Sequence, residues 1–383
     1  MHLSTEQVRA LSESTFRRFL ESQIPEGTHI DYKRQLDDAK GDEWKRELLK
    51  DATGFANAEG GHIVYGVLEP REGIATNQQI IGISSHTDVA QRIERVLAAC
   101  IDSRVSGLVV LPVLIAGKGC VFVHIPPSYS KPHMVISGSH RGFYIRHSES
   151  TMSMSTFEIR ESVLSTANAE QRAESISSET ADVIMRAVDK PCFVMQAVPL
   201  IKPSVPWPVM GKTFDSVARG TDARREFADP FNLCSGRAPI ANIHGLVANS
   251  GELMNCEWSF QLRRTGHVLC SFSFDPLTLG DAPAAPLISA TTFDLFRAFT
   301  VLVEEADKCA DSDLTYLFRA DFFCAHGAIF LRREGHFSAP LILHQASLQW
   351  PPQVRLPGRS YTEIAEQWAL EFSNAFGSRT LLN

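Results

Sequence analysis

The segment from Glu26 to Gly73 constrains the fold of this 383-residue chain more than any other, because it predicts a strand, a helix and a strand in close succession. Its first part, residues 27–36, alternates polar and apolar side chains in the manner of a strand. Such alternation places Asp31 and Lys33 on the same face of the strand, so that a carboxylate and an ammonium group point the same way.

A helix follows from about Asp42 and ends at Gly60 and Gly61. Apolar side chains recur in it at steps of four and three residues, as expected for one buried helix face: Trp44, Leu48, Ala52 and Phe55. Asp42 can cap the N-terminus, and the two glycines can adopt the backbone conformations that end a helix. Residues 62–68 are so apolar that they predict a central strand covered on both faces, with Glu69 at its C-terminal end.

The flanking sequence predicts further elements of the same domain. Upstream, a capping-box pattern starts a helix over about residues 5–21. Downstream, one helix begins near Thr87, and a second capping box, formed by Ser155 and Glu158, starts another. The remaining pattern predicts short strands at 79–84, 108–115, 120–125 and 142–147. It also predicts a loop at 131–134.

The second half of the chain predicts a separate domain, because 383 residues exceed one ordinary core. The apolar pattern fades over residues 166–189, which we interpret as a linker or an inter-domain helix. We therefore predict an α+β protein, with a mixed α/β domain over 1–165 and an α+β domain with a largely antiparallel sheet over 190–383. Its expected elements are strands at 192–201, 242–248, 254–263, 267–275, 314–320 and 327–333, helices at 289–307 and 360–376, and a loop at 202–240.

Charge and composition limit the class of protein. The formal net charge of -7 gives no overall basic character, so contact with nucleic acid has to rest on a local patch. The first 25 residues lack the apolar core of a signal peptide, and no run approaches the roughly 18 apolar residues of a membrane span. We expect a cytoplasmic protein without membrane contact.

Three carboxylates of the first segment could meet at strand ends, and they are Glu26, Asp31 and Glu69. Hydrolysis of a phosphodiester by Mg²⁺ or Mn²⁺ uses such carboxylates as metal ligands, and a nearby cation such as Lys33 offsets negative charge that develops. Three acids within 44 residues are also common in any domain. From their spacing alone, they fit exposed solubilising charges or ion pairs as well.

The order of motifs resembles the Schlafen AlbA-like domain, a family also described as a divergent AAA or DNA-binding domain. An acid stands five residues before an acid-aromatic-lysine triplet, a helix ends in Phe-Ala-Asn-Ala-Glu-Gly-Gly, and a strand ends in Gly-Val-Leu-Glu. The pattern continues through Lys131-Pro132 and the stretch from Tyr144 to Met152. It covers about residues 10–165, and the second half of the chain resembles no family that we can name.

The resemblance implies a metal-dependent endoribonuclease that acts on structured RNA such as tRNA, with a role in prokaryotic stress or phage defence. The family's three metal-binding acids fall on Glu26, Asp31 and Glu69, and its lysine falls on Lys33. Where the family usually has glutamate, this chain has the shorter Asp31, which can displace a metal ligand by about an ångström. An ATP site is not supported, because residues 116–119 lack the spacing of a phosphate loop.

Two other functions stay open on the same residues. The domain could bind DNA or RNA as a regulatory protein without cutting it, or it could serve as a scaffold for protein contacts. In the nuclease and the nucleic-acid-binding interpretations, RNA is favoured over DNA as the partner, and a homo-oligomer is compatible with the chain. Phosphate contacts are then expected at Lys45, Arg46, Lys50, Lys131 and Arg146.

Overall fold

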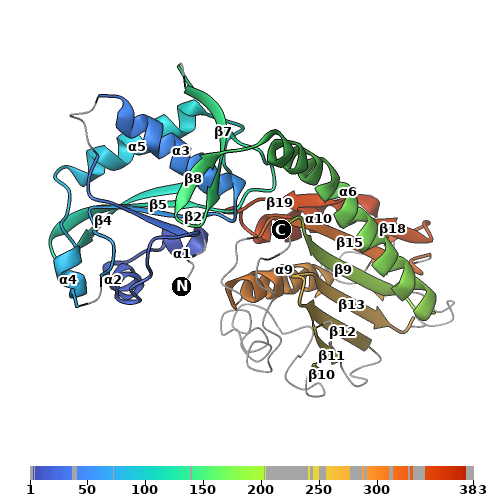
Figure 1. Cartoon of the computed structure of the whole chain (residues 1–383). Helices are drawn as coiled ribbons and strands as arrows, with labels where there is room; N and C mark the ends of the chain where they lie inside the picture. The colour runs from blue at the N-terminus through green and yellow to red at the C-terminus, as the bar shows by residue number, and fades with distance from the viewer. Residues whose placement is uncertain are drawn as a thin grey trace. The chain divides into compact units, whose positions relative to one another are not determined.

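In the computed structural model, the predicted strand–helix–strand unit supplies two neighbouring strands of a four-stranded sheet and a helix that packs on it (Figure 1). Strand β1 (Ile30–Lys33) is parallel to β2 (Gly61–Tyr65), and helix α3 (Glu43–Asn57) connects them. Strands β5 (Lys118–Ile125) and β4 (Val109–Ile115) extend the sheet with antiparallel pairing, in the order β1–β2–β5–β4. All five residues of β2 are buried, which confirms that it is a central strand.

The chain divides into two units, which are described separately. The N-terminal unit comprises Met1–Ala169, Asp311–Leu314 and Leu356–Gly358, and the C-terminal unit comprises the rest. The residues that the structure describes are 3, 5–36, 41–71, 73–138, 140–201, 203, 240–241, 245–249, 256–276, 287–288, 291–309, 314–326, 328–330 and 341–376.

Strand β2 supplies side chains to two apolar cores, one on each face of the sheet. Ile63 and Tyr65 pack with α3 and with helix α5 (His86–Cys100). Val64 packs on the opposite face with α1 (Thr5–Arg9) and α2 (Glu13–Glu21). Because side chains alternate along a strand, one apolar run feeds both cores.

The expected single helix over residues 5–21 is wrong, because the chain forms α1 and α2 instead. Ser12 has extended backbone angles between them, and its hydroxyl accepts a hydrogen bond from the Thr15 amide at 3.3 Å. This is the geometry of a new N-cap, which competes with helix continuation. The capping box predicted at Ser4 lies outside the described residues.

The turn after α3 needs its two glycines and its asparagine. A Cβ on Gly60 would lie 2.6 Å from the Pro127 nitrogen, and one on Gly61 would lie 2.4 Å from the Phe55 ring. The Asn57 amide donates to the carbonyls of His133 and Tyr144, and its oxygen accepts from the His133 amide. The motif therefore joins the end of α3 to a second sheet.

That second sheet consists of four strands, three of which the sequence pattern did not predict, namely β3 (Ile101–Asp102), β6 (Met134–Ser137) and β8 (Ser150–Ser153). Its order is β3, β6, β7 (His140–His147) and β8. The strand expected at 79–84 is wrong: α4 (Thr76–Gln79) occupies its start, and Ile80 forms a single bridge to Val67. The chain turns there because Gly66, with φ 87°, accepts the amides of Ile81 and Gly82.

The C-terminal unit contains an antiparallel sheet of eight strands, as predicted for this half of the chain. Its order is β10–β11–β12–β13–β9–β15–β18, with β19 also paired to β15. The bounds of its strands are β9 (Cys192–Pro199), β10 (Ile240–Ala241), β11 (Gly245–Asn249), β12 (Cys256–Arg263), β13 (Val268–Phe274), β15 (Tyr316–Phe323), β18 (Ser347–Gln349) and β19 (Gln353–Arg355). Short strands β14 (Leu287–Ile288), β16 (Ile329–Phe330) and β17 (Leu341–Ile342) form a separate sheet.

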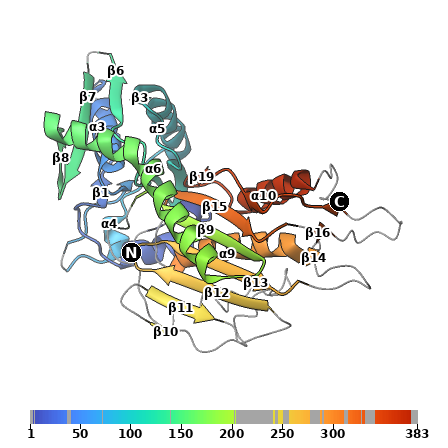
Figure 2. The ribbon, with the colours of Figure 1, turned by 90° about the vertical axis from the view of Figure 1, so that its right-hand side faces the viewer.

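Helices cover both faces of the eight-stranded sheet. Helices α9 (Thr291–Cys309) and α10 (Thr362–Ala375) lie along one face (Figure 2). Their Phe296 and Phe372 rings contact Phe193 of β9. On the other, Val194 packs against Ala181 of α6 (Thr156–Ala187). The chain therefore has an α+β fold in both units. Most of the segment interpreted as a linker or inter-domain helix, 166–189, belongs to this 32-residue helix.

The capping box predicted at the start of α6 is present. The Ser155 hydroxyl lies 3.2 Å from the Glu158 amide, and Glu158 accepts from the Ser155 amide at 2.7 Å. Much of the loop expected at 202–240 lies outside the described residues. Among the helices that the structure describes, none is both long enough and apolar enough to cross a bilayer.

Candidate functional site

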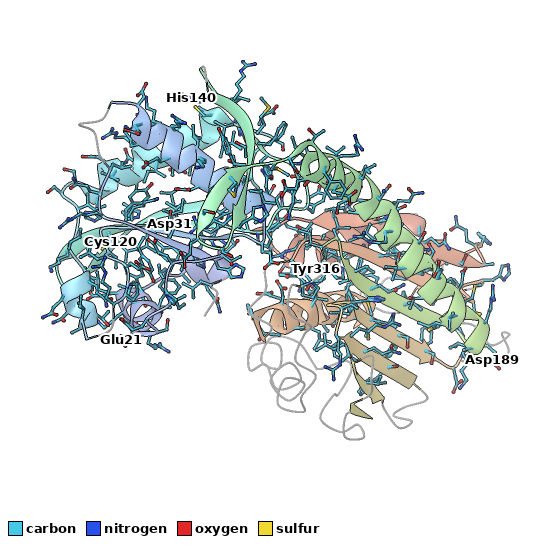
Figure 3. The ribbon with its side chains drawn as sticks, in the orientation of Figure 1. Glu21, Asp31, Cys120, His140, Asp189 and Tyr316 are labelled. Atoms are coloured by element: carbon cyan, nitrogen blue, oxygen red, sulfur yellow. The ribbon has the colours of Figure 1, made fainter. Side chains whose placement is uncertain are left out.

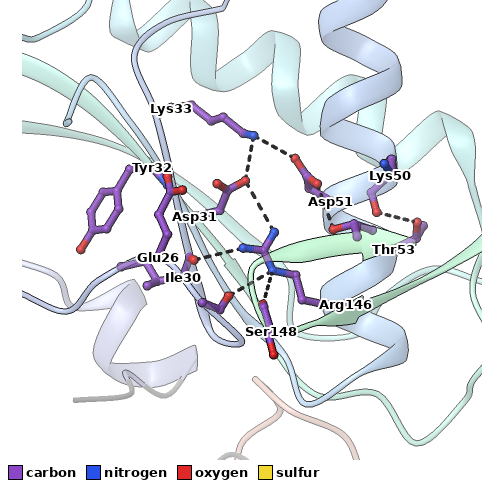
Figure 4. Close-up of polar contacts among 12 residues, drawn as sticks. Glu26, Ile30, Asp31, Tyr32, Lys33, Lys50, Asp51, Thr53, Arg146 and Ser148 are labelled. Atoms are coloured by element: carbon purple, nitrogen blue, oxygen red, sulfur yellow. Dashed lines mark hydrogen bonds and ion pairs between the residues drawn. The ribbon is translucent and has the colours of Figure 1, made fainter. Parts of the chain in front are cut away.

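An ion pair at the C-terminal end of β1 forms the centre of the candidate site. The Nζ atom of Lys33 lies 2.9 Å from Oδ2 of Asp31, as the shared strand face predicts (Figure 4). Asp31 is only 5% exposed, whereas the side chain of Lys33 is 30% exposed. The Asp31 carboxylate is therefore inside the N-terminal unit (Figure 3), and the Lys33 side chain reaches the surface.

A second carboxylate, Asp51 of α3, shares the same lysine. Its Oδ2 lies 3.2 Å from Lys33 Nζ, and its Oδ1 accepts a hydrogen bond from the Thr151 hydroxyl at 3.1 Å. Gly54 makes room for this contact, because a Cβ there would lie 2.5 Å from Cγ2 of Thr151. The sequence reasoning missed Asp51. The signal was present, because positions 44, 48, 51 and 55 follow the spacing of a buried helix face.

Arg146 of β7 closes the cluster from a third element. Its Nε donates to the carbonyls of Gly27 and Ser148 at 3.0 and 3.2 Å, and its Nη2 lies 3.4 Å from the Ile30 carbonyl. Its Nη1 is 3.9 Å from Asp31 Oδ2, and the guanidinium lies over the Phe55 ring. Arg146 thus ties the entry of β1 to the β7–β8 turn.

The pKa values of the cluster follow from burial and from its charges. Burial, and then the neighbouring Asp51, raise the pKa of Asp31 to about 6, although Lys33 and Arg146 oppose this. For Lys33, burial alone would lower the pKa, but Asp51 and Asp31 together raise it. Lys33 is therefore positively charged at neutral pH and holds two carboxylates together.

The other two predicted acids lie near Tyr32, whose side chain is on the opposite face of β1 from Asp31. Glu26 Oε1 accepts a hydrogen bond from the Tyr32 amide at 3.0 Å. The Tyr32 hydroxyl donates to the Ile24 carbonyl, and burial, Glu26 and Glu69 all raise its pKa. Both glutamates are half-buried, and their negative charges disfavour ionisation of the Tyr32 phenol.

In this arrangement the three acids do not fit one divalent cation. Asp31 already lies against Lys33 and Arg146, and Glu26 holds a backbone amide. Within the described ranges, no three or more His, Cys, Asp or Glu side chains gather in a way that could hold a metal ion. Glu26, Asp31 and Glu69 as shared ligands of Mg²⁺ or Mn²⁺ stay a prediction.

Two of the five cations expected to contact phosphate have internal partners. Lys131 Nζ donates to the carbonyl of Ala58, the residue after α3, and burial lowers the pKa of Lys131. A cation at the C-terminal end of a helix stabilises the helix dipole, and α3 has no basic residue of its own in its last turn. Arg146 is 5% exposed and makes the contacts described above.

The other three cations lie on α3. Lys45 Nζ is 2.6 Å from the exposed Asp42 carboxylate. Arg46 is exposed and Lys50 is half-buried, and the four-residue spacing places both on the same side of the helix. Arg34, which follows Lys33 directly, is also exposed. We call the four residues Lys33, Arg34, Arg46 and Lys50 the basic edge.

Comparison with known proteins supports the resemblance in the N-terminal unit. Residues 26–155 match the protein-family model described as Schlafen, AlbA_2, which confirms the relationship that the motifs predict for this segment. No curated protein matches the chain.

Two solved structures are similar to part of the chain. One is the DIP2311 protein of Corynebacterium diphtheriae, with 17% identity over 35% of this chain and a TM-score of 0.26. That match spans only 23% of the DIP2311 chain. The other is the N-terminal domain of an ATP-dependent DNA helicase RecG-related protein of Nitrosomonas europaea, with 18% identity over 38% of this chain, 91% of that chain and a TM-score of 0.27.

Proposed function

We propose that the N-terminal unit binds nucleic acid, RNA in preference to DNA, at the basic edge and does not cut it. The observation that supports this proposal is the Lys33 bridge, in which the acid at a family metal-ligand position is engaged by a cation. The family match over residues 26–155 supports a nucleic-acid partner. A chain with net charge -7 needs a local positive patch for such binding, and the four cations of the basic edge would supply it.

Phosphate contacts dominate such binding and make it dependent on salt. Each lysine or arginine that neutralises a phosphate releases counterions, so affinity falls as salt rises. Double-helical RNA presents its backbone in a regular shape, which a helix face with cations one turn apart can follow without reading bases. Acidic residues of the same segment, Asp42, Glu43 and Glu47, repel phosphate, so we expect the basic edge to contact only a few phosphates.

The test is a binding titration of tRNA and of double-stranded DNA at several salt concentrations. Replacing Arg46 and Lys50 together by glutamate is expected to weaken RNA binding at least tenfold and to lower the salt slope by about two. The matched control is Arg95→Glu, an exposed arginine of α5. Equal affinity of the double variant and the control would contradict the basic edge.

The metal-dependent endoribonuclease is the second candidate. The observation in its favour is the order of Glu26, Asp31, Lys33 and Glu69 within the matched segment. Incubation of tRNA with Mg²⁺, Mn²⁺ or chelator separates the two functions, with Glu26→Ala and Asp31→Ala beside the exposed-acid control Glu59→Ala. We expect binding without cleavage. Metal-dependent cleavage that both site variants abolish and the control retains would establish the nuclease instead.

A further inference from the structure

A row of polar side chains in the C-terminal unit leads from helix α6 across the eight-stranded sheet to Arg263 of β12. The amide nitrogen of Gln196 donates to the Ser177 carbonyl of α6 at 2.8 Å, and its oxygen lies 3.2 Å from Nε2 of His267. His267 Nδ1 lies 3.2 Å from Nη1 of Arg263. Gln196 and His267 are 0% and 2% exposed, whereas Arg263 is half-buried. The row therefore connects a helix carbonyl to an arginine that reaches solvent.

The direction of each hydrogen bond in this row follows from its partners. The Ser177 carbonyl only accepts, which fixes the orientation of the Gln196 amide. The Gln196 oxygen then accepts from Nε2 of His267, and the lone pair on Nδ1 accepts from Arg263. This arrangement needs a neutral imidazole, and burial, followed by the charge of Arg263, lowers the pKa of His267 to about 3. His267 therefore orients the guanidinium without neutralising it.

The guanidinium of Arg263 has no acidic partner among the residues that the structure describes. Burial lowers the pKa of Arg263, and no described carboxylate opposes this. Arg319, which is the register partner of Gln196, is by contrast paired with Asp321. Because Nη1 of Arg263 is engaged by His267, its Nε–Nη2 edge has no hydrogen-bond partner within the described ranges. Such an edge can donate two parallel hydrogen bonds to two oxygens of one anion.

The same face of the sheet is polar next to Arg263. Its register partner on β11 is Gly245, which adds no side chain to this face. Gln261 lies two residues away along β12, at about 7 Å, and its side chain points the same way. Ser259 and Ser271, which are paired across β12 and β13, continue the row of side chains on this face. These three side chains are half-buried and make no hydrogen bond with any described residue.

We infer that this face of the β12–β13 pair binds a phosphate monoester of a small polar molecule, with the phosphate on the Nε–Nη2 edge of Arg263. Two phosphate oxygens match the fork of the guanidinium. The third oxygen and the hydroxyl groups of the ester meet Gln261 and Ser271, whose side chains both donate and accept. A carboxylate has only two oxygens, and Arg263 would use both. The ligand class is therefore a nucleotide or a sugar phosphate.

The buried row gives such a site its affinity. A free arginine side chain loses rotamer freedom when it binds an anion, but the hydrogen bond to His267 holds Arg263 in place beforehand. Burial of Gln196 and His267 is unfavourable unless their polar atoms are paired, and this row pairs them. His267 and Gln196 are thus positioning residues for Arg263. The site lies in the C-terminal unit and is independent of nucleic-acid binding at the basic edge.

Calorimetric titration of the full chain with AMP, ribose 5-phosphate, inorganic phosphate and succinate at low salt tests the site. We expect both esters or one of them to bind more tightly than inorganic phosphate and succinate. Arg263→Lys keeps the charge but lacks the fork, so it should weaken ester binding about tenfold. The matched control is Arg264→Lys, at the exposed next residue, which should bind as the wild type does. Absence of ester binding, or an equal loss in both variants, would overturn the site.

Two further measurements make the test specific. Binding of tRNA should be the same in Arg263→Lys and in the wild type, so that failure of this site and failure of the basic edge are distinguishable. Succinate or inorganic phosphate that binds as tightly as the esters would overturn the ligand class. In case Arg263→Lys does not fold, NMR of arginine Nε–H groups in the wild type decides independently. The tighter-binding ester should shift one such resonance, and a spectrum without any shift at saturation excludes the proposed contact.

Discussion

The two units contain the same sequence pattern, a pair of opposite charges two residues apart on a strand, and use it differently. In the N-terminal unit, Asp31 and Lys33 of β1 form an ion pair whose lysine is 30% exposed and shared with Asp51. In the C-terminal unit, Arg319 of β15 donates three hydrogen bonds to Asp321, at 2.9, 3.0 and 3.2 Å, and another to Ser178 of α6. Asp321 is 0% exposed.

The difference lies in what covers each pair. Burial raises the pKa of both aspartates, and each is opposed by its own cation. Helix α6 closes the Arg319 pair, so its partners are all internal. The Lys33 pair opens to solvent, so its cation can meet a ligand. The closed pair is therefore structural, and the open pair is the candidate for function.

The largest effect is expected from breaking the closed pair. Arg319→Leu leaves the Asp321 carboxylate buried without its cation, which should lower the free energy of unfolding by about 3 kcal/mol. Urea unfolding followed by circular dichroism measures this, with the exposed Arg264→Leu as control. The double variant Arg319→Leu/Asp321→Leu should recover most of the loss, since an apolar pair has no charge to desolvate. If stability does not recover, Arg319 contributes more than neutralisation of Asp321, for example through its hydrogen bond to Ser178.

Breaking the open pair should have a smaller effect that depends on pH. Lys33→Met leaves Asp31 and Asp51 facing each other, and we expect a loss of about 2 kcal/mol at pH 8, below the fully buried case because Lys33 is partly solvated. The pKa of Asp31 is about 6 when folded, above its ordinary value near 4, so the folded state binds more protons between these values. The contribution of Asp31 to stability therefore falls as pH rises through this window.

It follows that the Lys33→Met loss should shrink at pH 5, where Asp31 is mostly neutral. Denaturant unfolding at pH 5 and pH 8 checks the sign. Asp31→Asn should flatten the pH dependence between about 4 and 6, and adding it to Lys33→Met should restore stability at pH 8. An equal loss at both pH values would contradict the raised pKa of Asp31.

Arg146 tests the comparison further, because it is buried beside Asp31 and binds backbone carbonyls at the start of β1. Arg146→Lys can replace only some of the hydrogen bonds to Gly27, Ser148 and Ile30, so we expect a loss of about 1 kcal/mol in the unfolding free energy. The control is Arg141→Lys on the same strand, where the side chain is exposed. Weaker RNA binding without any loss of stability would instead indicate a direct phosphate contact of Arg146.

The smallest effect is expected at Glu26. Glu26→Gln keeps an oxygen that can accept the Tyr32 amide, so stability should change by less than about 0.5 kcal/mol, whereas Glu26→Ala should lose about 1 kcal/mol. Thermal unfolding measures both. If the Gln variant instead abolishes binding of Mn²⁺ to the protein, measured by calorimetry, Glu26 is a metal ligand and the arrangement around Asp31 has to change on binding.

Local sequence patterns predicted the helices and strands of the N-terminal unit better than they predicted which side chains contact one another. Alternation placed Asp31 and Lys33 on one face, and the pair of glycines marked the end of α3. The strand expected at 79–84 failed because the conformation of Gly66 turns the chain before a ladder can form. The spacing of the buried face of α3 includes Asp51, but only the fold brings its partners Lys33 and Thr151 against it.

The sequence by itself determined the β1–α3–β2 unit, the glycine turn and the resemblance of residues 26–155 to the Schlafen AlbA_2 model, because each rests on spacing along the chain. Only the tertiary structure decided that Arg146 and Lys131 donate hydrogen bonds to carbonyls of the N-terminal unit. It also decided that Asp31 meets Lys33 and Asp51 while Glu26 and Glu69 lie near Tyr32. The reason is physical: the pKa and the partner of a charged group depend on what packs over it, and residues distant in sequence supply that cover.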